Sequence, residues 1–196
     1  MFGKIGQKNF LFAKLLKKEA RIKKIRQNYV CYCDNRQKLV FLRVKTHHYR
    51  MKTVFQWLND GVPMPELDFG LLERWIGLVA AEYGKQAHEL TYIFCNDEKI
   101  LEVNRQYLQH DYYTDIITFD YTRGKMLRGD IYLSLDTVAS NAKEVGANYD
   151  DELLRVIIHG VLHLCGINDK GPGEREIMEQ NENKSLQIYS QLKSEK

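Results

Sequence analysis

The sequence has little of what marks extended, secreted or membrane-embedded proteins. Only three of its 196 residues are proline, and no Gly/Ser-rich or Gln/Asn-rich tract argues for a long linker. No run of about 18 apolar residues occurs, so we expect no membrane-spanning helix and no membrane partner. With 44% hydrophobic and 28% charged residues, the chain has the composition of a globular protein with its own core.

Cysteine is also scarce, and its spacing argues against a disulfide framework or a Cys-x-x-Cys metal site. The four cysteines are Cys31, Cys33, Cys95 and Cys165. The most apolar early stretch, residues 10–16, is interrupted by Lys14 and is too short for the core of a signal peptide. We therefore expect reduced thiols and a cytoplasmic location.

Charge is distributed unevenly along the chain. Residues 1–50 contain 14 basic and two acidic residues, a balance of +12. From the totals of 29 basic and 26 acidic residues, this leaves 15 and 24 for residues 51–196, a balance of −9. We interpret residues 1–50 as a basic N-terminal extension and residues 51–196 as the functional domain.

The basic extension has two interpretations. Apolar residues at helical spacing in 10–16, followed by the basic run 17–26, indicate an amphipathic helix attracted to phosphate or anionic lipid. Alternatively, Met51 is the natural start and the extension is a mis-called segment without function, because every pattern that we can interpret follows Met51.

Hydrophobic periodicity after Met51 predicts an α+β fold, a small mixed sheet of about four strands flanked by about five helices. The expected strands are 54–57, 89–95, 115–121 and 129–135, and the expected helices are 69–84, 97–108, 136–145, 152–165 and 174–192. Asp150 and Asp151 stand where the N-cap and a first-turn acid of the helix over 152–165 belong.

A metal site is predicted on this helix, in the C-terminal half of the chain. His159 and His163 are four residues apart, so their side chains lie one turn apart on the same face. Gly166 ends the helix, and the following loop brings Asp169 within reach as a third ligand. Two imidazoles and one carboxylate leave a tetrahedral ion one position for water, as in catalytic zinc sites.

The histidine pair is open to other interpretations. Two histidines at this spacing also occur as core or surface residues of an amphipathic helix. Against that, burying unpaired imidazoles in the apolar helix VIIHGVLHLCG costs free energy. A peptidase is disfavoured, because Gly160 stands where HExxH proteases carry the Glu that acts as general base.

Three motifs resemble the YbeY family of bacterial zinc-dependent endoribonucleases, which are implicated in rRNA maturation and ribosome quality control. HGVLHLCGINDK, residues 159–170, resembles the family signature HGxLHLxGxDH. Residues 104–119 are similar to LNxxYRxxDxPTDVLSF, and residues 129–134 to the GDIxIS strand. The motifs occur in the family's order, which implies a small sheet flanked by helices with the metal held in a cleft.

The resemblance implies a function as well as a fold. It implies a single-strand-specific endoribonuclease with one Zn²⁺ on His159, His163 and Asp169 and no small-molecule cofactor. The ion would activate water or polarise a phosphoryl oxygen. The implied role is 16S rRNA 3′-end maturation and ribosome quality control, with rRNA and the small ribosomal subunit as partners. The alternative is a non-catalytic RNA-binding assembly factor with a structural metal site.

Three positions depart from the family pattern. Asp169 stands where the family usually has His, and a carboxylate ligand also suits divalent metals other than zinc. Leu108 replaces an Arg after the family's Tyr, which removes a positive charge from the expected cleft and favours the non-catalytic alternative. Tyr113 replaces a Pro.

Further site residues are candidates only. Thr114, Asp115 and Asp130 either line the cleft or cap and order the loops. The candidate substrate contacts are Arg105, Lys125 and Arg128, with His110 beside them, and each is equally a solvated surface group.

Overall fold

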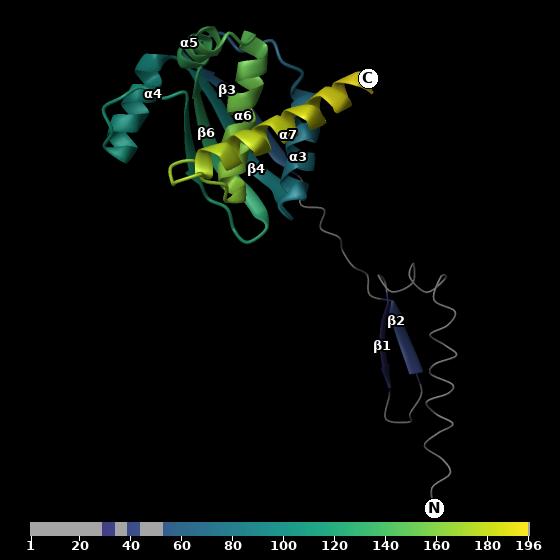
Figure 1. The fold of residues 1–196 in the computed structure, drawn as a ribbon. Helices are drawn as coiled ribbons and strands as arrows, with labels where there is room; N and C mark the ends of the chain where they lie inside the picture. The colour runs from purple at the N-terminus through teal and green to yellow at the C-terminus, as the bar shows by residue number, and fades with distance from the viewer. Residues whose placement is uncertain (1–28, 34–38, 44–52, 196) are drawn as a thin grey trace, which may run out of the picture. The chain divides into compact units, whose positions relative to one another are not determined.

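A computed structural model of the chain describes residues 29–33, 39–43 and 53–195, which belong to two compact units, 1–50 and 51–196 (Figure 1). In the first unit, β1 (Tyr29–Cys33) pairs antiparallel with β2 (Leu39–Arg43). No strands were predicted there, because the segment was interpreted by its charge. The basic helix that the pattern over 10–26 indicates lies outside the described residues.

The second unit contains a mixed four-stranded sheet, as predicted. Its strands lie in the order β3-β4-β6-β5. The first three run parallel, and β5 runs antiparallel to β6. The strands are β3 (Val54–Asp60), β4 (Gln86–Cys95), β5 (Ile116–Asp120) and β6 (Met126–Ser134).

Five α-helices accompany this sheet within residues 53–195, which confirms the predicted α+β class. They are α3 (Phe69–Glu82), α4 (Asp97–Val103), α5 (Leu135–Val145), α6 (Tyr149–Cys165) and α7 (Glu174–Ser194). None of these helices is long and apolar enough to cross a membrane.

Two helix boundaries differ from the prediction by three or more residues. The helix expected through Leu108 is α-helical only to Val103, and the π-helical turn η1 (Asn104–Leu108) follows. The start predicted for the metal helix was wrong: α6 begins at Tyr149, and the side chain of Asn148 accepts the Asp150 N–H at 2.8 Å. Because Asn148 already supplies the cap, Asp150 and Asp151 lie inside the first turn.

The residues that belong to the core show which face of the sheet each strand residue occupies. Helices α3 and α6 pack on the sheet, and α7 packs against both of them (Figure 1). On β6, the buried Leu127 and Ile131 belong to this core. Because side chains alternate along a strand, Arg128 and Asp130 point to the opposite face. On that face, α4 packs in a separate cluster with Ile117.

Candidate metal centre

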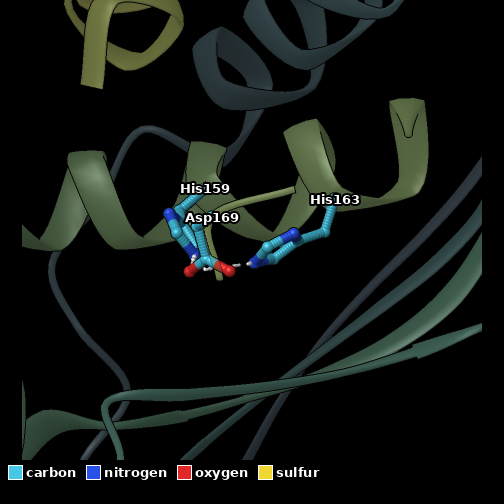
Figure 2. A group of neighbouring side chains, drawn as sticks. All are labelled: His159, His163 and Asp169. Carbon is cyan, nitrogen blue, oxygen red and sulfur yellow. Dashed lines mark ion pairs between the residues drawn. The ribbon is translucent and has the colours of Figure 1, made fainter. Parts of the chain in front are cut away.

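The turn after α6 brings the three predicted ligands together. Gly166 ends the helix with φ +96°, a conformation that favours glycine, and its N–H donates to the carbonyl of His163 at 2.9 Å. The next amide, of Ile167, donates to the carbonyl of Leu162 at 3.0 Å. The chain thereby reverses direction within a few residues, and Asp169 returns to the helix face that carries the histidines (Figure 2).

The distances among the three side chains suit one ion. Oδ2 of Asp169 lies 3.6 Å from Nε2 of His159 and 3.8 Å from Nε2 of His163. One ligand atom from each residue lies within 4.8 Å of the others. Two ligand atoms bound to a tetrahedral ion at about 2.1 Å lie about 3.4 Å apart. The group therefore fits a divalent ion after small side-chain movements.

Hydrogen bonds fix which nitrogen each imidazole offers. Nδ1 of His159 donates to Oε1 of Glu182 at 2.7 Å, and Nδ1 of His163 donates to the carbonyl of Ile167 at 2.9 Å. A carboxylate oxygen and a backbone carbonyl oxygen both accept hydrogen bonds, so this arrangement assigns the proton of each neutral ring to Nδ1. Both Nε2 lone pairs are then available toward Asp169, which is the tautomer that a metal site requires.

Glu182 is a site residue that the sequence analysis missed. It lies on α7, is only 5% exposed, and pairs with Arg155 at 3.0 Å. The sequence pattern of α7 did contain an indication that Glu182 is buried. Met178, Glu182 and Ser185 are buried at helical spacing on α7, so a carboxylate occupies a position in the buried stripe. Such a carboxylate requires a partner, but the sequence alone does not say that the partner is His159.

The pKa values of the two histidines are shifted in opposite directions. Burial lowers the pKa of His163 below its ordinary value, and the neighbouring His159 lowers it further. Burial also acts to lower the pKa of His159, but the hydrogen bond and negative charge of Glu182 outweigh it, so this pKa is raised. The carboxylate thus makes His159 the more basic of the two imidazoles.

Gly160 explains why no HExxH-type base is present. A Cβ at this position would lie 2.9 Å from Cδ1 of Ile116 and 3.1 Å from Cγ2 of Ile131. Any side chain at this position would require its neighbours to move. Glycine supplies no general base at the place of the protease Glu, which supports the interpretation that the site does not belong to an HExxH peptidase.

Two of the candidate cleft residues lie near the ligands. Asp115 lines two hollows that both include His159 and Asp169, and its Oδ2 accepts a hydrogen bond from Asn141 at 3.3 Å. Thr114 lines one of these hollows, which also includes His163 and which we call the metal cavity.

Of the candidate substrate contacts, His110 also lines the metal cavity, and the remaining candidates lie elsewhere. Arg128 and Asp130 line a hollow on the opposite face of the sheet. Arg105 pairs with the exposed Asp111 at 2.6 Å, and Lys125 lies in the turn before β6. None of these four lines either of the hollows at His159 and Asp169.

Similarity to known proteins identifies the family of this chain. The family model described as Endoribonuclease YbeY matches residues 69–190, which contain the whole metal group. The chain belongs to the YbeY family. The matched YbeY region lies entirely within the second compact unit, and the basic extension 1–50 precedes it.

YbeY relatives match along most of their own length. A protein of Bacteroides thetaiotaomicron named Endoribonuclease YbeY is 68% identical over 128 residues, which are 65% of this chain and 93% of that protein. A protein of the same name from Porphyromonas gingivalis is 48% identical over 127 residues, 65% of this chain and 84% of that protein. The solution structure of TM1509 from Thermotoga maritima superposes with a TM-score of 0.51 at 27% identity, covering 72% of this chain and 93% of that one.

Proposed function

We propose that this chain is a metal-dependent endoribonuclease that cleaves single-stranded RNA, acting in the cytoplasm on the 3′ end of 16S rRNA and in ribosome quality control. The names of the family model and of its relatives support endoribonuclease activity. The observation that carries the proposal is the convergence of two Nε2 atoms and one carboxylate beside a cavity. The small ribosomal subunit and its rRNA are the proposed partners.

The donor set suits one zinc ion. His159, His163 and Asp169 supply three ligands, as in catalytic zinc sites, and a fourth position is left for water or substrate. A bound ion at this place supplies Lewis acidity, which favours attack on a phosphodiester by water. Asp169 in place of the family's usual His widens the range of divalent metals that the site accepts.

The chain's own residues have distinct roles in this reaction. Glu182 and the carbonyl of Ile167 hold the two imidazoles in the required tautomer. Asp115 lines the cavity beside His159, and Asn141 orients its carboxylate. We assign Asp115 the task of accepting a proton from the attacking water, because a general base has to stand within reach of that water without being a ligand.

One alternative function has a specific observation in its favour. Leu108 lines the metal cavity at the position where the family pattern has Arg. A cavity without that charge holds a phosphate more weakly. The alternative is an RNA-binding assembly factor whose metal site serves only stability.

The two functions are separated by elemental analysis of the purified chain combined with a cleavage assay on single-stranded RNA. The proposal predicts about one zinc per chain, loss of cleavage on chelation and recovery when zinc is restored. Cleavage that chelation leaves unchanged would contradict it. RNA binding with no cleavage at any metal loading would establish the alternative.

A further inference from the structure

The segment between η1 and β5 carries exposed aromatic side chains beside the metal cavity. Tyr112 is 54% exposed and Tyr113 is 58% exposed. His110 and Tyr112 both line the cavity that contains His159 and His163. We call residues 110–113 the aromatic loop. Large apolar rings in contact with water carry a free-energy cost that binding of a ligand removes.

The aromatic loop is held in place by specific contacts. The buried Asn104 donates from its side-chain amide to the carbonyl of Tyr112 at 2.8 Å. The carbonyl of Asn104 accepts the amide of His110 at 3.3 Å, across Gln109 in the left-handed conformation with φ 58°. These bonds tie both ends of the loop to η1, so its rings are presented in a defined arrangement rather than by a free chain.

Within the loop, two rings already form a stack. The centroids of His110 and Tyr112 are 5.1 Å apart and their planes are inclined by 21°. Their polar atoms, Nδ1 of His110 and Oη of Tyr112, lie 3.0 Å apart at hydrogen-bond distance. A pair of nearly parallel rings offers a further flat ring a surface for stacking.

The charge of the cavity argues against phosphate as the main source of affinity. Besides histidines, its charged lining residues are four acids and one base, namely Asp115, Asp120, Asp169, Glu174 and Lys170. The base is Lys170, and the position where the family pattern has Arg is Leu108, 42% exposed. A bound divalent ion offsets only part of this negative charge. Affinity for a polyanion therefore needs a contribution that does not depend on phosphate.

We propose that the aromatic loop binds unpaired nucleobases of the RNA by stacking, and thereby holds a single strand across the metal cavity. The inference rests on the proposed function, since it takes RNA as the substrate. Stacking on aromatic side chains tolerates any base, because every base has a flat face. Bases in a duplex have both faces covered, so the loop selects single strands without selecting sequence. The cavity, at about 660 Å³, has the size of ordinary ligand sites.

Binding to the metal-free full chain tests the inference apart from catalysis. We would measure anisotropy of a labelled single-stranded oligoribonucleotide and of the same oligonucleotide with abasic positions. Salt is kept high enough to suppress phosphate binding, including that of the basic extension. Tyr112→Leu and Tyr113→Leu remove a ring, and Tyr112→Phe keeps it. Tyr149→Leu, an exposed tyrosine at the start of α6 outside the metal cavity, is the matched control.

The inference predicts different changes in RNA affinity for the different variants and oligonucleotides. Each leucine variant in the loop weakens binding of intact RNA by roughly ten-fold, the range for one stacked base. Tyr112→Phe and Tyr149→Leu stay near wild type. Abasic RNA binds weakly and equally to wild type and variants, and circular dichroism confirms that each variant is folded.

Two outcomes would overturn the inference. Unchanged binding of intact RNA by both leucine variants would show that the loop does not contact bases. Equal losses for intact and abasic RNA would show that the loop acts through the backbone or the fold. Because cleavage is assayed separately with metal, a chain that stacks RNA without cutting it refutes only the proposed function. A chain that cleaves RNA, but whose leucine variants bind RNA as tightly as the wild type, refutes only this inference.

Discussion

His159 on α6 and Glu182 on α7 are joined by a 2.7 Å hydrogen bond from imidazole Nδ1 to carboxylate Oε1. The bond links two helices that meet only through tertiary packing, and it sets the direction in which His159 presents Nε2. Arg155 holds the same carboxylate at 3.0 Å from its other oxygen. The metal group is therefore supported by the packing of α7 against α6, as well as by the helix that carries its histidines.

Replacing Glu182 is expected to weaken metal binding without removing a ligand. Glu182→Ala frees the ring of His159 to rotate and to change tautomer, so zinc affinity falls about ten- to a hundred-fold. Glu182→Gln can still accept the Nδ1–H through its amide oxygen, so its zinc affinity falls less. The measurement is competition with a chelator of known affinity. Glu176→Ala, an exposed glutamate on the same helix, is the control, and wild-type affinity in Glu182→Ala would refute the role.

Asp115 and Asp130 form a matched pair, because one lines the metal cavity and the other lies on the opposite face of the sheet. Asp115→Asn is expected to reduce RNA cleavage by about a hundred-fold or more, the scale of a lost general base, while bound zinc stays unchanged. Asp130→Asn is expected to leave cleavage within about two-fold, as for a surface change away from the reaction. The measurement is the single-turnover cleavage rate of each variant. A larger loss of rate in Asp130→Asn than in Asp115→Asn would mean that RNA is cleaved away from the metal cavity.

Gly160 and Gly77 allow a test of the close approach between α6 and the sheet. A Cβ at Gly160 meets Ile116 at 2.9 Å, whereas a Cβ at Gly77 on α3 meets nothing within 4 Å. Gly160→Ala is expected to destabilise the protein by about 1–3 kcal/mol through overpacking. Gly77→Ala is expected to stabilise it by about 0.5–1 kcal/mol through helix propensity. Urea unfolding measures both, and stabilisation by Gly160→Ala would show that the contact is not tight.

The domain boundary is tested by shortening the chain. A protein of residues 51–196 contains the four-stranded sheet, the five α-helices and all three proposed ligands. We expect it to unfold at the same temperature as the whole chain and to bind the same amount of zinc. Differential scanning calorimetry and elemental analysis measure the two properties. A large loss in either would show that residues 1–50 are integral to the domain.

The sequence predicted those features that depend on neighbours along the chain. The spacing of His159 and His163 follows from one helical turn, and the helix end follows from Gly166, so the grouping of these two histidines with Asp169 could be predicted in advance. Periodicity likewise located each strand and helix of the sheet unit to within a few residues. Asn148 was missed as a cap because the acids after it resemble one.

Features that depend on tertiary packing could not be predicted in the same way. Glu182 reaches His159 only because α7 crosses α6, and nothing local to either residue indicates that pairing. Asp130 was predicted as a candidate cleft residue but lies on the opposite face of the sheet. The alternation of side chains along its strand could be foreseen from the sequence. Once Ile131 is known to pack against Gly160, its neighbour has to face away. The missing information was which face of β6 the metal helix covers.

The third ligand tests the account most directly, because at Asp169 the chain departs from the family pattern. The measurement is bound zinc together with RNA cleavage for Asp169→Ala and Asp169→His. If Asp169 binds the ion, the alanine variant loses metal affinity and cleavage together, and the histidine variant keeps its metal because imidazole fills the same role. If Asp169→Ala retains zinc as tightly as the wild-type chain, Asp169 only orders the loop after Gly166, and the three-ligand site is contradicted.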